Sequence, residues 1–302
     1  MLLKAPWNER NGRFSPLKAV VFAALFAPAL YILWRFESGA LAPKPVTEMI
    51  HRTGDWAVRL LLLSLLITPL RKLAQWPKLI AVRRMVGVAA FAYAFAHFCL
   101  YIVDQKFDLL HVASEIVLRF YLTIGFVALW GLTSLSVTST DFMIRRMGPR
   151  WNRLHKTVYI LAALALFHYY LQSKADVSDP VMMTGFFLML MLYRLATKRL
   201  PLWGATLASV VLGTGLTALL EATWYAIRRH YPFWDVLGAN IDPDMFPRPT
   251  FYVALAGAVA LIVMAARNYR SVLRPAKKEG RDVVDAGRLD GVERRRPAHR
   301  QG

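Results

Sequence analysis

The chain has 302 residues, of which 56% are hydrophobic, and its formal net charge is +19. This apolar fraction excludes an ordinary soluble domain, because such domains are about 45–50% apolar even with glycine included. Lys and Arg lie between apolar segments and in the C-terminal tail, so the charge does not indicate a nucleic-acid partner. The single cysteine, Cys99, excludes an intramolecular disulfide, a cysteine-rich metal site and the C-x-x-C-H motif of covalently attached haem.

Eight apolar segments approach the length of about 20 residues that a helix needs to cross a bilayer. In chain order they are Leu17–Phe36, Thr53–Leu70, Met85–Val103, Phe120–Val137, Thr157–Ser173, Val177–Leu195, Leu200–Tyr225 and Phe251–Ala266. Short polar connections with Pro and Gly separate them. The sequence therefore predicts an all-α, polytopic transmembrane helix bundle of about eight spans, without a soluble domain. The first segment begins after Pro16 and is long, which favours a retained anchor over a cleaved signal peptide.

The distribution of Lys and Arg predicts the orientation of the bundle. With residues 1–16 in the cytosol, the inside segments hold seventeen of these residues and the outside loops eight, and the tail adds eleven more inside. We therefore expect an inner-membrane protein with both termini in the cytosol. Residues 269–302 form a basic tail that we expect to be disordered. Two interpretations of this tail stay open, a solvated charge run that reinforces the topology and a surface that binds anionic lipid.

Two of the seven histidines, His97 and His168, lie well inside predicted spans. Ionisable side chains within a membrane are costly and usually mark a ligand or a functional path. His97 lies twelve residues after Met85 and His168 twelve residues after Lys156, so the rise of about 1.5 Å per residue places both imidazoles at the same depth. Two such imidazoles can supply both axial positions of a haem iron. The alternative is that each histidine hydrogen-bonds a neighbouring helix.

His155 lies thirteen residues before His168, which corresponds to about 20 Å of continuous helix. It is either a ligand of an inner haem or an interfacial polar residue, and the sequence does not decide between the two. His51, at the outer mouth of the second span, is a candidate ligand, proton donor or helix-start residue. We expect His111 in an outside loop, and His230 and His299 at the surface.

Three segments carry a resemblance to a known family: PVTEMIHRTGDWAVRLLLLSLLITPLRK, RRMVGVAAFAYAFAHFCLY and PRWNRLHKTVYILAALALFHYYLQSK. Together they resemble the MsrQ family, the haem-binding membrane subunits of periplasmic methionine sulfoxide reductases, within the wider ferric-reductase-like transmembrane group. The resemblance covers residues 17–198, a six-span bundle, and leaves two additional spans in residues 199–268 unexplained. It implies haem b bound by His97, His155 and His168, FMN as a further candidate cofactor, and electron delivery to a molybdenum-containing catalytic subunit, MsrP.

The sequence departs from the oxidases of this wider group at one candidate haem position. Those relatives carry a second histidine fourteen residues before the outer ligand, where this chain has Arg83. A guanidinium does not ligate iron, but Arg83 or Arg84 can pair with haem propionates or with a flavin phosphate. The alternative is that both arginines are ordinary positive-inside charges. The sequence is therefore compatible with one bound haem or with two.

No G-x-G-x-x-G dinucleotide-binding domain follows the bundle, so electrons must come from the quinone pool or from a cytosolic flavin reductase. The leading hypothesis is an electron-transfer subunit whose partner carries the catalytic site. The alternatives are a stand-alone ferric or quinone reductase, a proton-coupled transporter and a plain membrane anchor. Inverted repeats and broken helices would favour a transporter, and neither is clear in the sequence.

Overall fold

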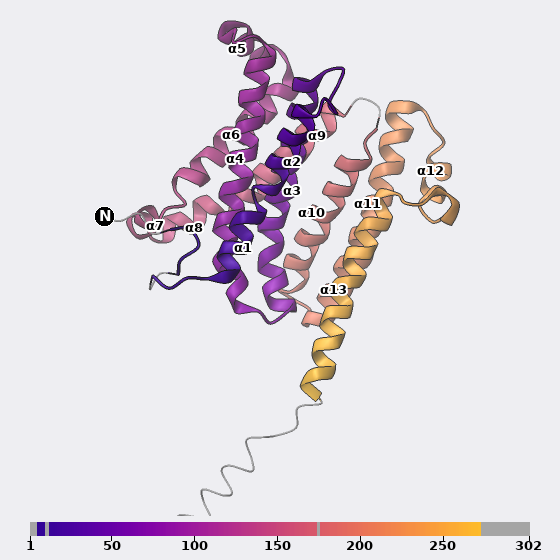
Figure 1. The fold of residues 1–302 in the computed structure, drawn as a ribbon. Coiled ribbons are helices and arrows are strands. Elements are labelled where there is room, and N and C mark those ends of the chain that lie inside the picture. Colours follow the sequence, from indigo (N-terminus) through magenta and orange to yellow (C-terminus); the bar gives the residue numbers. More distant parts are fainter. Residues whose placement is uncertain (1–4, 10–11, 174–175, 273–302) are drawn as a thin grey trace, which may run out of the picture.

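The computed structural model describes residues 5–9, 12–173 and 176–272. Over these residues every regular element is a helix, which confirms the all-α bundle (Figure 1). Seven helical segments are long and apolar enough to cross a membrane. They are Pro16–Glu37 (α1, Pro16–Ala24, and α2, Ala27–Glu37), α3 (Pro45–Leu73), Pro77–Asp104 (η1, Pro77–Leu79, and α4, Ile80–Asp104), α6 (Phe120–Val137), α10 (Ser178–Ala196), α11 (Leu202–Arg229) and Pro249–Asn268 of α13 (Pro249–Val272).

The segment predicted as the fifth span differs most from expectation. It is α9 (Val158–Gln172), a helix of 15 residues that rises only about 22 Å. α7 (Asp141–Met147) and α8 (Pro149–His155) precede it, and Gly148, at a φ of 53°, separates these two short helices. The helix is interrupted between His155 and Val158, so the prediction of one continuous helix from His155 to His168 is wrong. Because α9 falls below the spanning length, the even number of spans is not established, and the cytosolic placement of both termini stays a prediction.

Short helices occupy the connections at both ends of the bundle. α5 (Leu109–Leu118) follows α4 and carries His111, which was predicted in a loop. α12 (Phe233–Ala239) and η2 (Pro243–Met245) join α11 to α13, and His230 caps the C-terminal end of α11. His299 and most of the predicted basic tail lie outside the described residues.

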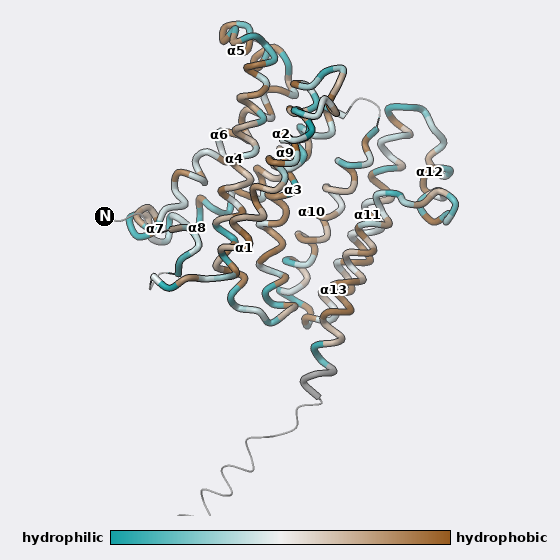
Figure 2. The backbone as a smooth tube through the Cα atoms, in the orientation of Figure 1, coloured by the Kyte–Doolittle hydropathy of each residue, from teal (hydrophilic) through white to brown (hydrophobic). Residues whose placement is uncertain are grey.

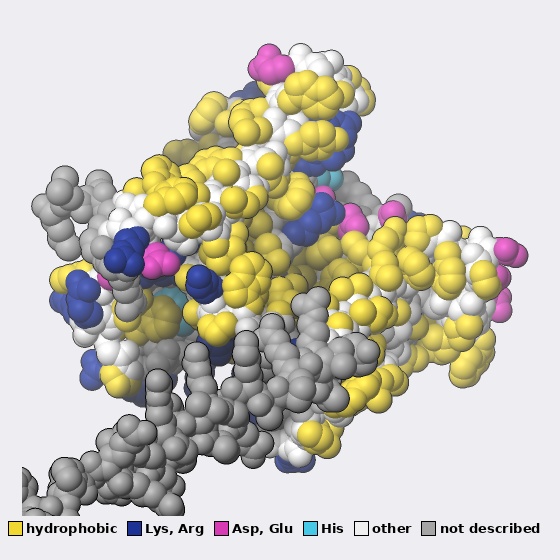
Figure 3. All heavy atoms as spheres, turned by 60° about the horizontal axis from the view of Figure 1, so that its bottom comes forward, with side chains coloured by type: hydrophobic (Ala, Val, Ile, Leu, Met, Phe, Trp, Pro, Cys, Tyr) yellow, Lys and Arg dark blue, Asp and Glu magenta, His cyan; other side chains and the backbone are white. Residues whose placement is uncertain are grey.

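The core lies where α3 and α4 pack together and meet α6, α9 and α10 (Figure 1). Leu65, Val86 and Ala162 are each at most 2% exposed there. The outward faces are also apolar, with Ile160, Val211 and Ile262 more than 60% exposed. Hydrophobic residues run along the tube in Figure 2 and cover the flanks in Figure 3. A bundle that is apolar both inside and outside is suited to a lipid environment.

A proline in α3 explains why an arginine of α10 reaches into the core. Pro69 has no N–H, so the carbonyl of Leu65, one turn earlier, loses its helical partner. The guanidinium of Arg194 donates to this oxygen at 2.6 Å, and it also donates to Leu190 of its own helix at 2.9 Å. Arg194 therefore satisfies a buried acceptor and ties α10 to α3.

The last two long helices, α11 and α13, pack beside α10 at a glycine-lined contact. A Cβ at Gly185 of α10 would lie 2.3 Å from the hydroxyl oxygen of Thr217, so the helices approach closely only because this side chain is absent. Near one end of α11, Glu221 is 1% exposed and accepts from Arg248 at 2.8 Å. Because the charge is paired, the carboxylate can lie inside the bundle.

Candidate functional site

The structure brings together His97 of α4 and His168 of α9. Their ring centroids are 6.3 Å apart and the ring planes are inclined at 82°. The two side chains therefore lie side by side, as their matched depths predicted, although they come from different helices and are separated by 71 positions in the sequence.

Both rings are anchored through the same nitrogen. Nδ1 of His97 lies 2.7 Å from the backbone oxygen of Ile50 on α3, and Nδ1 of His168 lies 2.8 Å from that of Tyr121 on α6. A carbonyl oxygen only accepts hydrogen bonds, so each Nδ1 must carry the proton. In a neutral imidazole Nε2 then keeps a free lone pair, which is the form that binds a metal ion.

The distance between the two ring centroids fits a pair of imidazoles that share one metal ion. Metal–imidazole bonds are about 2 Å long, so two imidazoles on opposite sides of one ion have ring centres about 6 Å apart. Among the described residues no group of three or more His, Cys, Asp or Glu side chains could hold a metal ion. Two imidazoles therefore suit an ion whose other ligands come from a macrocycle. The backbone acceptors of both Nδ1 atoms are the outer partners that orient metal-binding histidines.

Sequence reasoning missed two glycines at this site. The ring of His97 lies against Gly54 and the ring of His168 lies against Gly125, so closely that a methyl group at either position would meet the imidazole. In the sequence, a glycine lies one turn after each of the two residues whose carbonyls accept from the histidines. This pattern indicates a contact only once it is known that α3 packs against α4 and α6 against α9. Gly54 lies within the first of the three segments that carry the family resemblance.

His51 lies one turn before Asp55 on α3, and its side chain is exposed. Asp55 is within hydrogen-bonding reach of Tyr169, the residue after His168. His51 is also within electrostatic range of His97. Its function stays a prediction.

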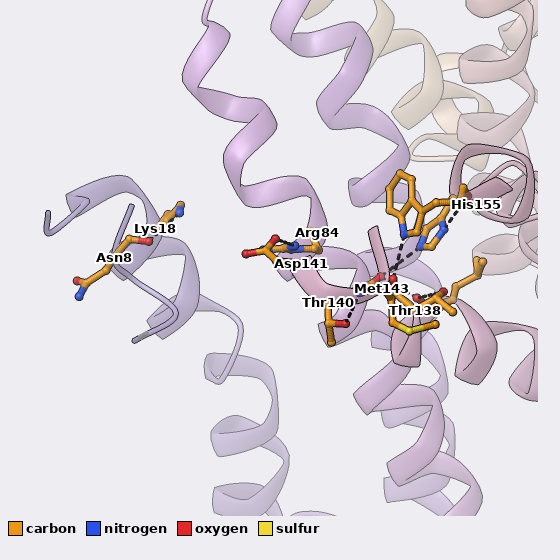
Figure 4. Close-up of polar contacts among 11 residues, drawn as sticks. Asn8, Lys18, Arg84, Thr138, Thr140, Asp141, Met143 and His155 are labelled. Carbon is orange, nitrogen blue, oxygen red and sulfur yellow. Dashed lines mark hydrogen bonds and ion pairs between the residues drawn. The ribbon is translucent and has the colours of Figure 1, made fainter. Parts of the chain in front are cut away.

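His155 lies at the end of α8 in a different environment (Figure 4). Its ring stacks on Trp151 with centroids 3.8 Å apart. Nδ1 donates to the backbone oxygen of Trp151 at 3.2 Å, and Nε2 lies 3.3 Å from the hydroxyl oxygen of Ser139. Burial lowers the pKa of His155 below its usual value. Both ring nitrogens have polar neighbours, so binding a metal here would require a contact to be given up.

The two arginines of α4 also differ from each other. Arg84 pairs with Asp141 at 2.6 Å, and both side chains are about half exposed (Figure 4). Arg83 is within electrostatic range of Tyr159 and Arg194. Arg83 is also within electrostatic range of His155, where its charge would attract an anionic group.

A cavity of about 580 Å³ lies between α1 and α4. Its lining is mainly apolar and includes Phe22, Phe26, Val88 and Ala92. Lys18 and Arg84 also line it, and Figure 4 shows them on separate helices. Further along α4 it is lined by Ala96, the residue before His97. The cavity therefore extends along α4 from a basic region to the neighbourhood of the histidine pair.

The fold defines a multi-pass membrane protein whose bundle holds two adjacent histidines. Residues 53–166 match the family model described as "Ferric reductase like transmembrane component". This match includes His97 and ends two residues before His168. No solved structure matches the chain.

Curated relatives then identify the family. The chain is 39% identical over 177 residues to the "Protein-methionine-sulfoxide reductase heme-binding subunit MsrQ" of Caulobacter vibrioides, covering 58% of this chain and 84% of the relative. It is 40% identical over 184 residues to the protein of the same name from Xanthomonas campestris pv. campestris strain 8004, covering 59% and 84%. The chain belongs to the MsrQ family.

Proposed function

We propose that this chain is a b-type haem electron-transfer subunit of the bacterial inner membrane that serves a periplasmic, molybdenum-dependent methionine sulfoxide reductase, MsrP. The observation that carries the proposal is the pair His97 and His168, each with Nδ1 bound to a backbone carbonyl and Nε2 left as the ligand atom. Haem b, when bound, supplies one-electron chemistry. The catalytic site for methionine sulfoxide lies on the partner.

In this proposal the chain holds and shields the cofactor. His97 and His168 would hold the haem through their Nε2 atoms, and the carbonyls of Ile50 and Tyr121 fix the protonated Nδ1 atoms. Phe95 and Phe167, which are near the ligands in the sequence, are 51% and 46% exposed on the outside of the bundle, so they would face lipid and keep this part of the protein apolar. A low-polarity surrounding and fixed ligand orientation are two of the means by which a protein tunes a haem.

The proposal also concerns the number of haems and the binding of FMN. A first haem at His97 and His168 uses two free Nε2 atoms. A second cofactor near His155 would instead meet Arg83, whose charge favours haem propionates or a flavin phosphate, whereas the charge of Arg84 is paired with Asp141. Because the nitrogens of His155 already have polar neighbours, we favour one haem and an anionic cofactor or donor at that end.

The electron donor is either quinol from the membrane or a cytosolic flavin reductase. The cavity between α1 and α4 favours quinol, because it is mainly apolar and extends toward His97. Its basic end, at Lys18 and Arg84, is on the side that the positive-inside rule places in the cytosol. Quinol in this cavity and a cytosolic flavin reductase would therefore both deliver electrons at the cytosolic side of the bundle.

A visible spectrum of the purified protein tests the proposal. Expressed with sufficient haem, the wild type should be red and give a reducible low-spin haem spectrum, whereas His97→Ala and His168→Ala should each lose this haem. His230→Ala, at the exposed end of α11, is the control and should keep it. A colourless wild type would reject the proposal and favour a transporter or a membrane anchor.

A second assay separates the electron-transfer subunit from a stand-alone reductase. The reduced protein is mixed with purified MsrP and methionine sulfoxide, or with ferric chelate or quinone alone. Oxidation of the haem only when MsrP and its substrate are present supports the proposed partner. Equally fast oxidation by ferric chelate or quinone, with no transfer to MsrP, would favour the stand-alone reductase.

A further inference from the structure

The surroundings of His97 and His168 repeat the same construction on two helix pairs. In each case the imidazole of one helix crosses to a carbonyl of a neighbouring helix, and the sequence separation between histidine and carbonyl is 47 residues in both. In each case a glycine follows the carbonyl residue by four positions, Gly54 after Ile50 and Gly125 after Tyr121.

Helix geometry explains why the glycine lies one turn after the carbonyl. In an α-helix the carbonyl oxygen of residue i points toward residue i+4 and accepts the N–H of that residue. The oxygen has a second lone pair, which the imidazole Nδ1–H can use. A ring that approaches this lone pair from the side must pass over residue i+4, where a Cβ would stand in its way.

The space between each glycine and the imidazole ring is small. A Cβ at Gly54 would lie 3.0 Å from Nδ1 of His97 and 3.2 Å from Cε1. A Cβ at Gly125 would lie 2.7 Å from Cε1 of His168 and 2.8 Å from Nδ1. In both cases the atoms that would be displaced belong to the edge of the ring that makes the hydrogen bond, so the ring could move away only by weakening that bond.

We propose that Gly54 and Gly125 are positioning residues for the haem ligands: each keeps an open slot on its helix through which the imidazole donates Nδ1–H to a backbone carbonyl and presents Nε2 to the iron. This inference rests on the proposed function. The slots fix the tautomer of each ring and the angle between the two ring planes. Outer partners of this kind commonly change metal affinity or activity about 10- to 100-fold when they are lost.

The test compares alanine substitutions at four glycines in the full-length protein. Gly54→Ala and Gly125→Ala close the slots. Gly87→Ala lies on α4, the helix of His97, at a position where a Cβ would meet nothing within 4 Å. Gly185→Ala is the steric control, because its Cβ would collide with Thr217 in the contact between α10 and α11, away from both histidines.

Haem content, the low-spin EPR signal of the ferric protein and the midpoint potential are measured for every variant. We expect Gly125→Ala to retain haem about 10- to 100-fold more weakly, and Gly54→Ala to show a smaller loss because its clearance is larger. The haem that remains in either should have an altered EPR signal, which reports the orientation of the imidazole planes, and a shifted potential. Gly87→Ala should match wild type, and Gly185→Ala should lower thermal stability without changing the EPR signal or the potential.

Wild-type haem content, EPR signal and potential in both slot variants would overturn the positioning role while leaving the proposed function intact. A haem-free wild type would reject both. If Gly125→Ala does not accumulate as folded protein, Gly54→Ala decides, since its smaller overlap allows the ring to shift. A change of the same kind in Gly185→Ala would also overturn the proposal, because general loosening of the bundle would then explain the effect.

Discussion

The arginine that crosses from α10 to α3 allows a quantitative test of how a proline is accommodated inside the bundle. Arg194→Met keeps an apolar stem of similar length and removes the guanidinium that donates to the Leu65 oxygen at 2.6 Å. Since Pro69 cannot donate to this oxygen, the carbonyl would be left buried without a partner. An unpaired buried acceptor costs about 1–3 kcal/mol, so we expect the free energy of unfolding to fall by that amount.

The same substitution should cost less when the proline is absent. In Pro69→Ala the new N–H can bond the Leu65 oxygen within α3. The other contacts of Arg194, to the oxygen of Leu190 and to the ring of Tyr159, are the same in both backgrounds and cancel in the comparison. We therefore expect an interaction energy of about 1–2 kcal/mol between positions 69 and 194.

The assay is a double-mutant cycle on the detergent-solubilised protein, with reversible unfolding in denaturant followed by circular dichroism. The four proteins are wild type, Arg194→Met, Pro69→Ala and the double variant. Independent sites add to within about 0.5 kcal/mol. If Arg194→Met destabilises both backgrounds equally within that margin, the guanidinium does not replace the missing N–H, and the explanation of its position is refuted.

Three further predictions concern polar groups elsewhere in the chain. Arg248→Ala should lower stability by about 3–5 kcal/mol because it leaves the buried Glu221 carboxylate unpaired. Thermal unfolding checks this by comparing Arg248→Ala with the double variant that also carries Glu221→Gln, which should recover part of the lost stability. No recovery would contradict the prediction. Asp141→Asn should change stability by less than about 1 kcal/mol, since its ion pair with Arg84 is half exposed, and a larger shift in the same melt would show that the pair is more than a surface contact. His155→Ala should slow haem reduction by quinol or flavin reductase but not by dithionite, measured by stopped-flow absorbance, and equal rates in both assays would leave His155 as an interfacial residue.

Long apolar runs were predictable because length and composition alone define them. The span Phe120–Val137 agrees with α6 at both ends. The interruption between α8 and α9 was not predictable, since Lys156 and Thr157 carry no strong helix-breaking signal. The break between α1 and α2 did have a signal that was overlooked: Pro28 lies in the first turn of α2.

The histidine pair could be predicted, whereas the groups that orient it could not. Counting residues along two spans places His97 and His168 at one depth, because helical rise is uniform. Their hydrogen-bond partners are the backbone oxygens of Ile50 and Tyr121. Every residue type has a backbone oxygen, so the amino-acid sequence does not show which carbonyl accepts the hydrogen bond. The role of Arg194 was hidden for the same reason, since its acceptor is a carbonyl exposed by a proline on another helix.

The shortness of α9 has a consequence for how well the membrane insulates the histidine pair. A rise of about 22 Å is less than the hydrocarbon thickness of about 30 Å, so lipid beside this helix must thin or be replaced by the adjoining short helices. His168 lies four residues before the last residue of α9, which is about 6 Å of rise. The dielectric barrier at that end is correspondingly narrow. A cofactor held by His168 would therefore lie close to the surface at which a partner protein could dock.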